Sequence, residues 1–263
     1  MRRQNLRHQV KCTPEAVLGL LFVLVIGIAF GSSGSREAPH VLGAYVTDLS
    51  QRTPHQRYNA CRAAAALDGY TVPSRREFSF NRVVHGWTAD RGFMKAPVSY
   101  DGILIDDYGG GVCETSTTLY NAALLAGLPI LERHAHTFAP GYAPPGRDAA
   151  VAYSGVDLRF RNNEPWPITI RIGRDRDRLI CRIEAPGAPP SRVSLYAQIL
   201  DRFIPVPAGV APGSGSPRSV WRLKGKDGLR VAVYREYYHH GTFIRREFVS
   251  DDTYLAVSPA RWQ

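Results

Sequence analysis

The chain has 263 residues, of which 44% are hydrophobic and 21% are charged, and this ordinary globular composition excludes a disordered or a collagen-like protein. Lysine and arginine total 33 against 23 aspartate and glutamate residues. The resulting formal charge of +10 favours an anionic partner, although a solvated arginine-rich surface would give the same count. Four cysteines are too few for a disulfide scaffold.

The N-terminal residues 1–35 predict a membrane segment. Residues 1–11 carry four basic side chains, and an uncharged stretch of 20 residues then separates Glu15 from Arg36. A helix of that length rises about 30 Å, which is the thickness of the hydrocarbon core of a bilayer. A basic flank before an apolar span directs the C-terminal part out of the cytoplasm. We therefore expect a single-pass protein of the cell membrane with an extracytoplasmic C-terminal domain.

Cleavage of this segment near Gly31 would instead give a secreted protein. In the anchored form, Cys12 would face the cytosol. Export argues against a nucleic-acid partner, and no recognition-helix or zinc-finger pattern is present. Wall polymers and anionic lipid are therefore the expected anionic partners.

Next along the chain, local patterns predict a helix, a strand and a hairpin. An alanine-rich helix is expected over residues 57–67, with Cys61 as a packed side chain. Phe78 and Phe80 then alternate with polar residues, as in a strand. Residues 96–105 predict a β-hairpin that turns at an Asp-Gly pair.

A glycine loop, a helix and a strand follow. Three glycines at residues 109–111 precede a helix that is expected to start at Cys113 and to stop at Gly127. Residues 130–137 predict a strand, and a Pro- and Gly-rich loop follows over residues 140–148. With a period of two, the strand places four side chains on one face: Ile130, Glu132, His134 and His136.

The remainder of the chain is β in character. Alternating apolar residues predict strands over residues 156–160, 168–172 and 179–183, with Cys181 on an inward face. A last hairpin is expected to turn at His240-Gly241. These patterns predict an α+β fold with a small β-rich C-terminal extension. The expected parts are the membrane segment at residues 1–35, a main domain at residues 40–190 and the extension at residues 191–263.

Cys113 carries the strongest chemical signal in the sequence. The glycines before it let the backbone approach a substrate closely. A position at the start of a helix lowers a thiol pKa and offers free N–H groups to an oxyanion. A cysteine at a helix start, followed by histidine on a strand, is the layout of papain-like cysteine enzymes. Cys113 is therefore a candidate nucleophile, and a buried packing role is the alternative.

His134 and His136 are candidate bases for this thiol. At His-x-His spacing they could instead bind zinc, with Cys113, Glu132 or Asp148 as a third ligand, although the sequence offers no second dense ligand cluster. Asp148 could orient an imidazole, or it could cap the turn in which it lies.

Four stretches of the sequence together resemble the VanW domain family. They are EFSFNRVVHGWTADRGF (77–93), GGGVCETSTTLYNAALLAGL (109–128), ERHAHTFAPGYAPPGRDA (132–149) and DLRFRNN (157–163). The resemblance covers about residues 55–175 in the family's order, and residues 225–255 resemble a β-module that often follows this domain. Two residues depart from the family pattern, because Glu114 replaces a glutamine and Thr137 replaces a serine. A carboxylate beside the nucleophile would raise the pKa of the thiol.

The resemblance implies an activity on the cell wall. The family is named for an accessory gene of glycopeptide resistance clusters, and some members act as peptidoglycan L,D-transpeptidases through the cysteine of this motif. We therefore expect a cysteine-dependent acyltransferase that acts on peptidoglycan stem peptides without a cofactor or a metal. The rival is a non-catalytic accessory protein of vancomycin resistance that binds the wall or a glycopeptide. The donor, the acceptor, the choice between transfer and hydrolysis, and the oligomeric state stay open.

We also expect roles for individual residues. Cys113 would be the nucleophile, His136 the first candidate for the base and His134 the second, with Asp148 as the further catalytic residue. The expected oxyanion and substrate residues are Gly110, Gly111, Val112, Ser116 and Thr117.

Overall fold

The computed structural model describes residues 38–100, 103–205 and 225–257. The described residues all belong to one compact unit. The predicted membrane segment with Cys12, and the two turn residues 101–102 of the predicted hairpin, lie outside the described residues. Within the described ranges, no helix is long and apolar enough to cross a membrane.

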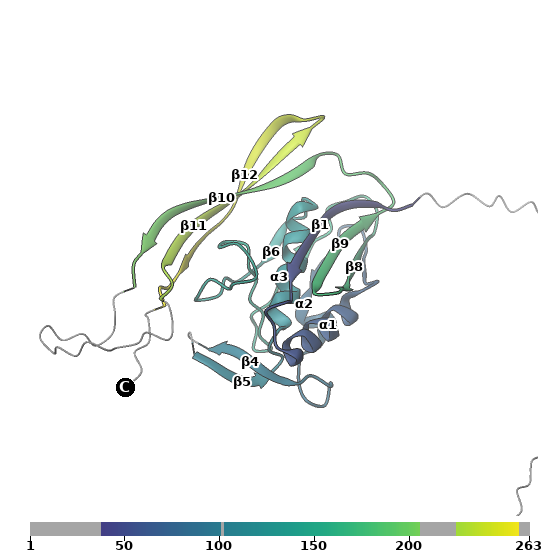
Figure 1. Cartoon of the computed structure of the whole chain (residues 1–263). Coiled ribbons are helices and arrows are strands. Elements are labelled where there is room, and N and C mark those ends of the chain that lie inside the picture. The colour runs from purple at the N-terminus through teal and green to yellow at the C-terminus, as the bar shows by residue number, and fades with distance from the viewer. Residues whose placement is uncertain (1–37, 101–102, 206–224, 258–263) are drawn as a thin grey trace, which may run out of the picture. The chain divides into compact units, whose positions relative to one another are not determined.

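A four-stranded antiparallel sheet and two helices build the core (Figure 1). The strands lie in the order β1 (His40–Asp48), β9 (Arg178–Ala185), β8 (Ile168–Asp175) and β2 (Thr71–Val72). Helix α3 (Val112–Leu125) packs against β1 and β9, and helix α1 (Pro54–Leu67) packs against β8 and α3. The side chains that were predicted to face inward are buried: Ile168, Ile170, Ile172, Leu179, Cys181 and Ile183.

Three further sheets complete the described fold and confirm the predicted α+β class. One has the order β3 (Glu77–Ser79), β7 (Arg159–Arg161) and β6 (Ile130–Glu132). A second is the hairpin of β4 (Lys95–Tyr100) and β5 (Ile103–Tyr108). The third has the order β10 (Arg192–Phe203), β11 (Gly228–His239) and β12 (Thr242–Tyr254). The predicted turn between the last two strands is confirmed, since His240 and Gly241 have φ values of 47° and 81°.

Local sequence explains the ends of the two long helices. The side chain of Thr53 accepts the N–H of Gln56, and the side chain of Gln56 accepts the N–H of Thr53. Because Pro54 fits the first helical position, α1 begins there and not at the predicted residue 57. Helix α3 stops as predicted before Gly127, which has a φ of 73°.

Three strands are shorter than the alternation of the sequence predicts. The one expected over residues 156–160 is β7, which begins only at Arg159. The run expected over residues 130–137 ends at Glu132, because β7 beside it has only three residues. The strand expected through Phe78 and Phe80 breaks before Phe80, where the hydroxyl of Ser79 accepts a backbone N–H and caps the short helix α2 (Phe80–Val84). Both phenylalanines are nevertheless fully buried.

The glycine loop before α3 is shaped by close packing within the chain. The φ angles of Gly109 and Gly111 are 85° and 106°. A Cβ atom on Gly109 would lie 2.1 Å from the ring of Trp87, and one on Gly111 would lie 2.2 Å from the carbonyl oxygen of Gln56. The glycines therefore let the loop lie against Trp87 and α1, which fixes the point at which α3 begins.

Candidate active site

Cys113 lies in the first turn of α3, next to the glycine loop. The residue is partly exposed, and in its neutral form the thiol donates to the carbonyl oxygen of Val151 at 3.5 Å. The three described cysteines, Cys61, Cys113 and Cys181, are all free thiols. A free cysteine near a helix N-terminus, on a residue that is partly exposed, has the position that a nucleophile requires.

The fold brings His136 and Asp148 to this thiol. The Nδ1 atom of His136 lies 2.5 Å from Oδ2 of Asp148, and the backbone N–H of His136 donates to the same oxygen at 2.8 Å. The imidazole lies close enough to the side chain of Cys113 for the two groups to shift each other's pKa. Because Asp148 holds Nδ1, the nitrogen left for Cys113 is Nε2. The three side chains have the order of a thiol, a base and an orienting carboxylate.

The electrostatics of this group favour a charged pair. Burial raises the pKa of the Cys113 thiol, but the hydrogen bond and the charge of His136 outweigh burial and hold that pKa below its ordinary value. Burial lowers the pKa of His136, whereas its hydrogen bonds to Asp148 and Cys113 raise this pKa to about 10. For Asp148, burial raises the pKa, and His136 and Arg133 bring it below the usual value. A thiolate, an imidazolium and a carboxylate are therefore the favoured forms.

His134 lies apart from this group. It makes an isolated bridge with Ala150, its side chain is 47% exposed, and its Nε2 atom lies 3.1 Å from Oε1 of Glu132. The two imidazoles therefore contact different carboxylates. Among the described residues, no cluster of three or more His, Cys, Asp or Glu side chains is arranged to hold a metal ion.

The backbone groups expected at an oxyanion are partly engaged within the glycine loop. The N–H of Val112 donates to the carbonyl of Gly109 at 2.9 Å. The carbonyl oxygens of Gly110 and Gly111 also accept hydrogen bonds, from the side chain of Asn59 and from a backbone N–H of α3. The N–H of Val112 is thus occupied in this conformation.

Ser116 and Thr117 are fully buried, although the sequence grouped them with the substrate site. The hydroxyl of Ser116 donates to the carbonyl of Ala149 at 2.7 Å, and the hydroxyl of Thr117 accepts the N–H of Ala149 at 2.9 Å. These bonds fasten the segment after Asp148 to the same helix that carries Cys113. Their effect on the site is to set the spacing between the carboxylate and the thiol.

The carboxylate of Glu114 is held by Arg52. Its Oε2 atom accepts from Nε of Arg52 at 2.7 Å, and the side chain is 1% exposed. Burial raises the pKa of Glu114 despite this partner. The sequence predicted that this carboxylate would raise the pKa of the Cys113 thiol. In the structure that pKa is set by burial first and then by His136, Val151 and Asp148.

Three residues that contact the site carried no functional assignment from the sequence. The ring of Tyr142 meets the ring of His136 edge to face, with centroids 6.3 Å apart. Arg133 donates to Asp148 at 3.1 Å, and Tyr254 donates to Asp148 at 2.5 Å. Arg133 could have been suspected from its place in the histidine-bearing stretch. No local signal marks Tyr254, which is 106 residues from Asp148 in the chain.

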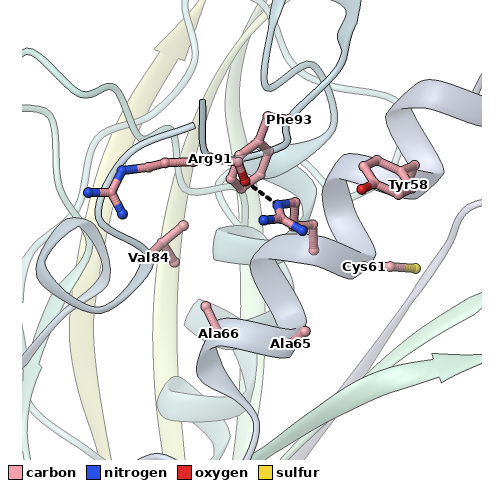
Figure 2. Close-up of a pocket in the computed structure, with 8 residues that line it drawn as sticks. Tyr58, Cys61, Ala65, Ala66, Val84, Arg91 and Phe93 are labelled. Atoms are coloured by element: carbon pink, nitrogen blue, oxygen red, sulfur yellow. Dashed lines mark hydrogen bonds between the residues drawn. The ribbon is translucent and has the colours of Figure 1, made fainter. Parts of the chain in front are cut away.

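Cys61 is partly exposed, which corrects its predicted packed position. The packed face of α1 consists of Asn59, Ala60, Ala63, Ala64 and Leu67, and Cys61 falls beside this face. It lines a surface hollow of about 570 Å³ together with Tyr58 and Phe93 (Figure 2). A second hollow, of about 760 Å³, is lined by residues that include Arg75 and Arg161, and neither hollow is lined by Cys113.

Comparisons with known proteins place this site in a recognised sequence family. Residues 55–184 match the family described as "VanW like protein". The chain is 39% identical over 152 residues to the uncharacterized protein YoaR of Bacillus subtilis. This match covers 58% of this chain and 50% of that protein. It is 27% identical over 137 residues to the vancomycin B-type resistance protein VanW of Enterococcus faecalis, which covers 50% of each protein. The chain thus spans about half the length of these curated relatives, and no solved structure matches it.

Proposed function

The chain belongs to the VanW family through residues 55–184, and from this premise we propose that it is a cysteine acyltransferase of the L,D-transpeptidase type that acts on peptidoglycan stem peptides. The observation that carries the proposal is the placement of Cys113 beside His136, whose Nδ1 atom lies 2.5 Å from Oδ2 of Asp148. A thiol that faces an imidazole, which is itself held by a carboxylate, meets the requirements of nucleophilic catalysis.

In the first step, the Cys113 thiolate attacks the carbonyl carbon of the third residue of a stem peptide. The amide bond to the terminal D-Ala breaks, and a thioester forms on Cys113. The D-Ala amine leaves with a proton from the imidazolium of His136, whose Nδ1 is held by Asp148 at 2.5 Å. The raised pKa of His136 keeps the imidazole protonated until the C–N bond breaks and the proton passes to the leaving amine.

In the second step, an amine of a neighbouring stem peptide attacks the thioester. Neutral His136 takes the proton of this amine, a new amide bond forms, and the Cys113 thiolate leaves. Water in place of the amine would give a free carboxylate, and the enzyme would then be a carboxypeptidase. The same three side chains serve both outcomes.

The tetrahedral intermediate needs a hydrogen-bond donor for its oxyanion. The N–H of Val112 is engaged with Gly109, so we assign this role first to the N–H of Cys113 itself, with the N–H groups of Gly110 and Gly111 beside it. N–H groups in the first turn of a helix lack intrahelical partners and lie at the positive end of the helix dipole.

The proposal places this chemistry outside the cytoplasmic membrane. Residues 1–35 would anchor the chain, or would be cleaved near Gly31 to release it. Peptidoglycan stem peptides lie in this compartment. Residues 1–35 hold +3 of the formal charge of +10, and the remaining +7 of the exported part suits an anionic wall.

A second candidate function follows from the similarity to the Enterococcus faecalis protein. The Enterococcus faecalis protein is a vancomycin B-type resistance protein. On this alternative, the chain is a non-catalytic accessory that binds the wall or a glycopeptide, and Cys113 has a structural role.

The deciding experiment incubates the full chain, purified in detergent, with disaccharide tetrapeptides and reads the products by mass spectrometry. We expect loss of D-Ala and a cross-linked dimer when an amine acceptor is present, and neither product with Cys113→Ser. If the folded wild-type chain forms no product but binds vancomycin or intact wall in a titration, the acyltransferase proposal is contradicted and the accessory function is supported.

A further inference from the structure

The last strand that the structure describes, β12, reaches the candidate active site from outside the family-matched residues 55–184. Tyr254, at the end of β12, is fully buried, and its hydroxyl donates to Oδ1 of Asp148 at 2.5 Å. The N–H of Gly146 donates to the same phenol oxygen at 2.7 Å. Because this oxygen accepts from Gly146, the phenol proton is directed to Asp148.

A second residue of β12, Asp252, acts through Arg133. Nη1 of Arg133 donates to Oδ1 of Asp252 at 2.5 Å, while Nη2 donates to Oδ1 of Asp148 at 3.1 Å. Nε of Arg133 donates to the backbone carbonyl of Asp148 at 2.6 Å. The Arg133 side chain is 6% exposed, so this planar group is fixed between two carboxylates with little freedom to turn.

These contacts complete the surroundings of the Asp148 carboxylate. Oδ2 accepts from the N–H and from Nδ1 of His136, and Oδ1 accepts from Tyr254 and Arg133. An ionised carboxylate offers about four acceptor positions, and all of them are occupied. Of the two donors to Oδ1, one belongs to β12 and the other is held by Asp252 of β12.

The orientation of His136 therefore depends on β12. A carboxylate that is held at Oδ1 cannot rotate, so its Oδ2 atom stays at the imidazole and Nε2 stays directed to Cys113. The backbone N–H of Leu255 also donates to the carbonyl of Thr137 at 2.8 Å, which fastens the end of β12 to the residue after His136. Partners of this kind, which hold a working group from behind, tune its direction and its basicity.

We propose that Tyr254 and Asp252 are positioning residues of the Cys113–His136–Asp148 group, so that the C-terminal sheet is part of the catalytic unit and the family-matched residues alone are insufficient. The inference rests on the proposed function, because it takes Cys113 as the nucleophile.

The test measures alkylation of Cys113 by iodoacetamide as a function of pH, with peptide-resolved mass spectrometry on the full chain. This readout needs no peptidoglycan, and a merely structural role would leave it unchanged in the folded protein. Tyr254→Phe removes only the hydroxyl. The matched control is Tyr238→Phe, because Tyr238 lies in the same sheet and also donates to a carboxylate, that of Glu236, at 2.8 Å.

We expect Tyr254→Phe to slow alkylation near pH 6 on the order of tenfold, the value of one hydrogen bond to a charged group, and to displace the profile to higher pH. The cause is a loosened carboxylate that no longer holds the imidazole at the thiol. Tyr238→Phe should follow the wild type. A Tyr254→Phe profile that overlays the wild type in folded protein, or an equal displacement in Tyr238→Phe, would overturn the inference.

Asp252→Asn covers the case in which Tyr254→Phe does not fold. Asparagine keeps the shape and one acceptor oxygen, so we expect a smaller displacement in the same direction, and an unchanged profile overturns the inference. The proposed function is judged separately by muropeptide transfer. If the wild-type chain is alkylated at low pH but transfers no stem peptide, only the proposed transferase activity is contradicted. If the chain does transfer stem peptides but neither substitution displaces its alkylation profile, only the proposed role of β12 is contradicted.

Discussion

The Oδ2 atom of Asp148 accepts two hydrogen bonds from one residue, His136: one from Nδ1 at 2.5 Å and one from the backbone N–H at 2.8 Å. Two bonds to one oxygen fix both the ring and the backbone of His136. The ring can then offer only Nε2 to Cys113, which makes the imidazole a base of defined direction. The buried carboxylate also favours the imidazolium over the neutral ring.

Replacing Cys113 by serine should abolish transfer while the fold remains. A serine hydroxyl has a far higher pKa than a thiol, and a helix N-terminus with one imidazole does little to activate it. We expect the turnover of muropeptides to fall on the order of 10²–10⁴-fold. The melting temperature should hardly change, because serine is accepted well at a helix start.

Cys61→Ser is the matched control for this substitution. Cys61 is also a free, partly exposed cysteine on a helix, but it lines the hollow of α1 and not the site (Figure 2). Its replacement should leave turnover unchanged. Full turnover in Cys113→Ser, or a collapsed melting curve in that variant, would show that Cys113 is structural.

Alkylation of Cys113 should remain fast below the pH at which an ordinary thiol reacts. The reactive form is the thiolate, and the Cys113 pKa lies below its usual value because His136 outweighs burial. The rate should therefore fall only when the pH drops below this lowered pKa. The imidazolium should persist up to the His136 pKa of about 10. Rates of iodoacetamide labelling across the pH range, resolved by peptide, measure this profile.

His136→Ala should displace the pH profile of Cys113 alkylation to higher pH. Without the imidazole, burial remains and raises the pKa of the thiol, so labelling of Cys113 near pH 7 should slow by about tenfold or more. Labelling of Cys61 in the same sample serves as the internal control. Equal rates for Cys113 in the wild type and in His136→Ala would refute the interaction between the two side chains.

The sequence predicts those parts of the fold that depend on neighbouring residues. Alternating apolar residues identify β8 and β9, the hairpin of β4 and β5 follows from strand-forming residues around a turn, and glycine ends α3. Strand lengths were less predictable because they depend on the partner. The strand predicted through His134 and His136 stops at Glu132, which lies opposite Arg159, the first residue of its antiparallel partner β7.

The candidate site was predictable in its residue types but not in its geometry. The spacing of His134 and His136 makes them look equivalent. The fold separates them, because Asp148 binds His136 whereas Glu132 binds His134. The donor Tyr254 lies 106 residues from Asp148, and only the packing of β12 brings the two together.

Glu114→Gln should stabilise the protein in a pH-dependent way. Burial raises the pKa of Glu114 above its ordinary value of 4.5, so ionisation is less favourable in the folded chain than in the unfolded chain. The wild type therefore loses stability as the pH rises from about 4 through the folded pKa, and glutamine does not. The melting temperature of the variant should exceed that of the wild type more at pH 7 than at pH 4. An advantage that is equal at both pH values, or absent, would contradict the raised pKa.

Gly111→Ala should destabilise the start of α3 more than backbone strain alone explains. Gly111 and Gly155 have nearly the same φ, 106° and 110°, so alanine at either position carries a similar left-handed strain of about 1–2 kcal/mol. A Cβ on Gly111 would lie 2.2 Å from the carbonyl oxygen of Gln56, whereas one on Gly155 meets no atom within 4 Å. Gly155→Ala thus isolates the strain, and the clash in Gly111→Ala should add about 1–3 kcal/mol to the loss. Melting curves measure the difference, and labelling of Cys113 should slow in Gly111→Ala alone. Equal losses of stability in the two variants would mean that the loop yields to the added methyl group, so that its close packing against α1 does not fix the position of the thiol.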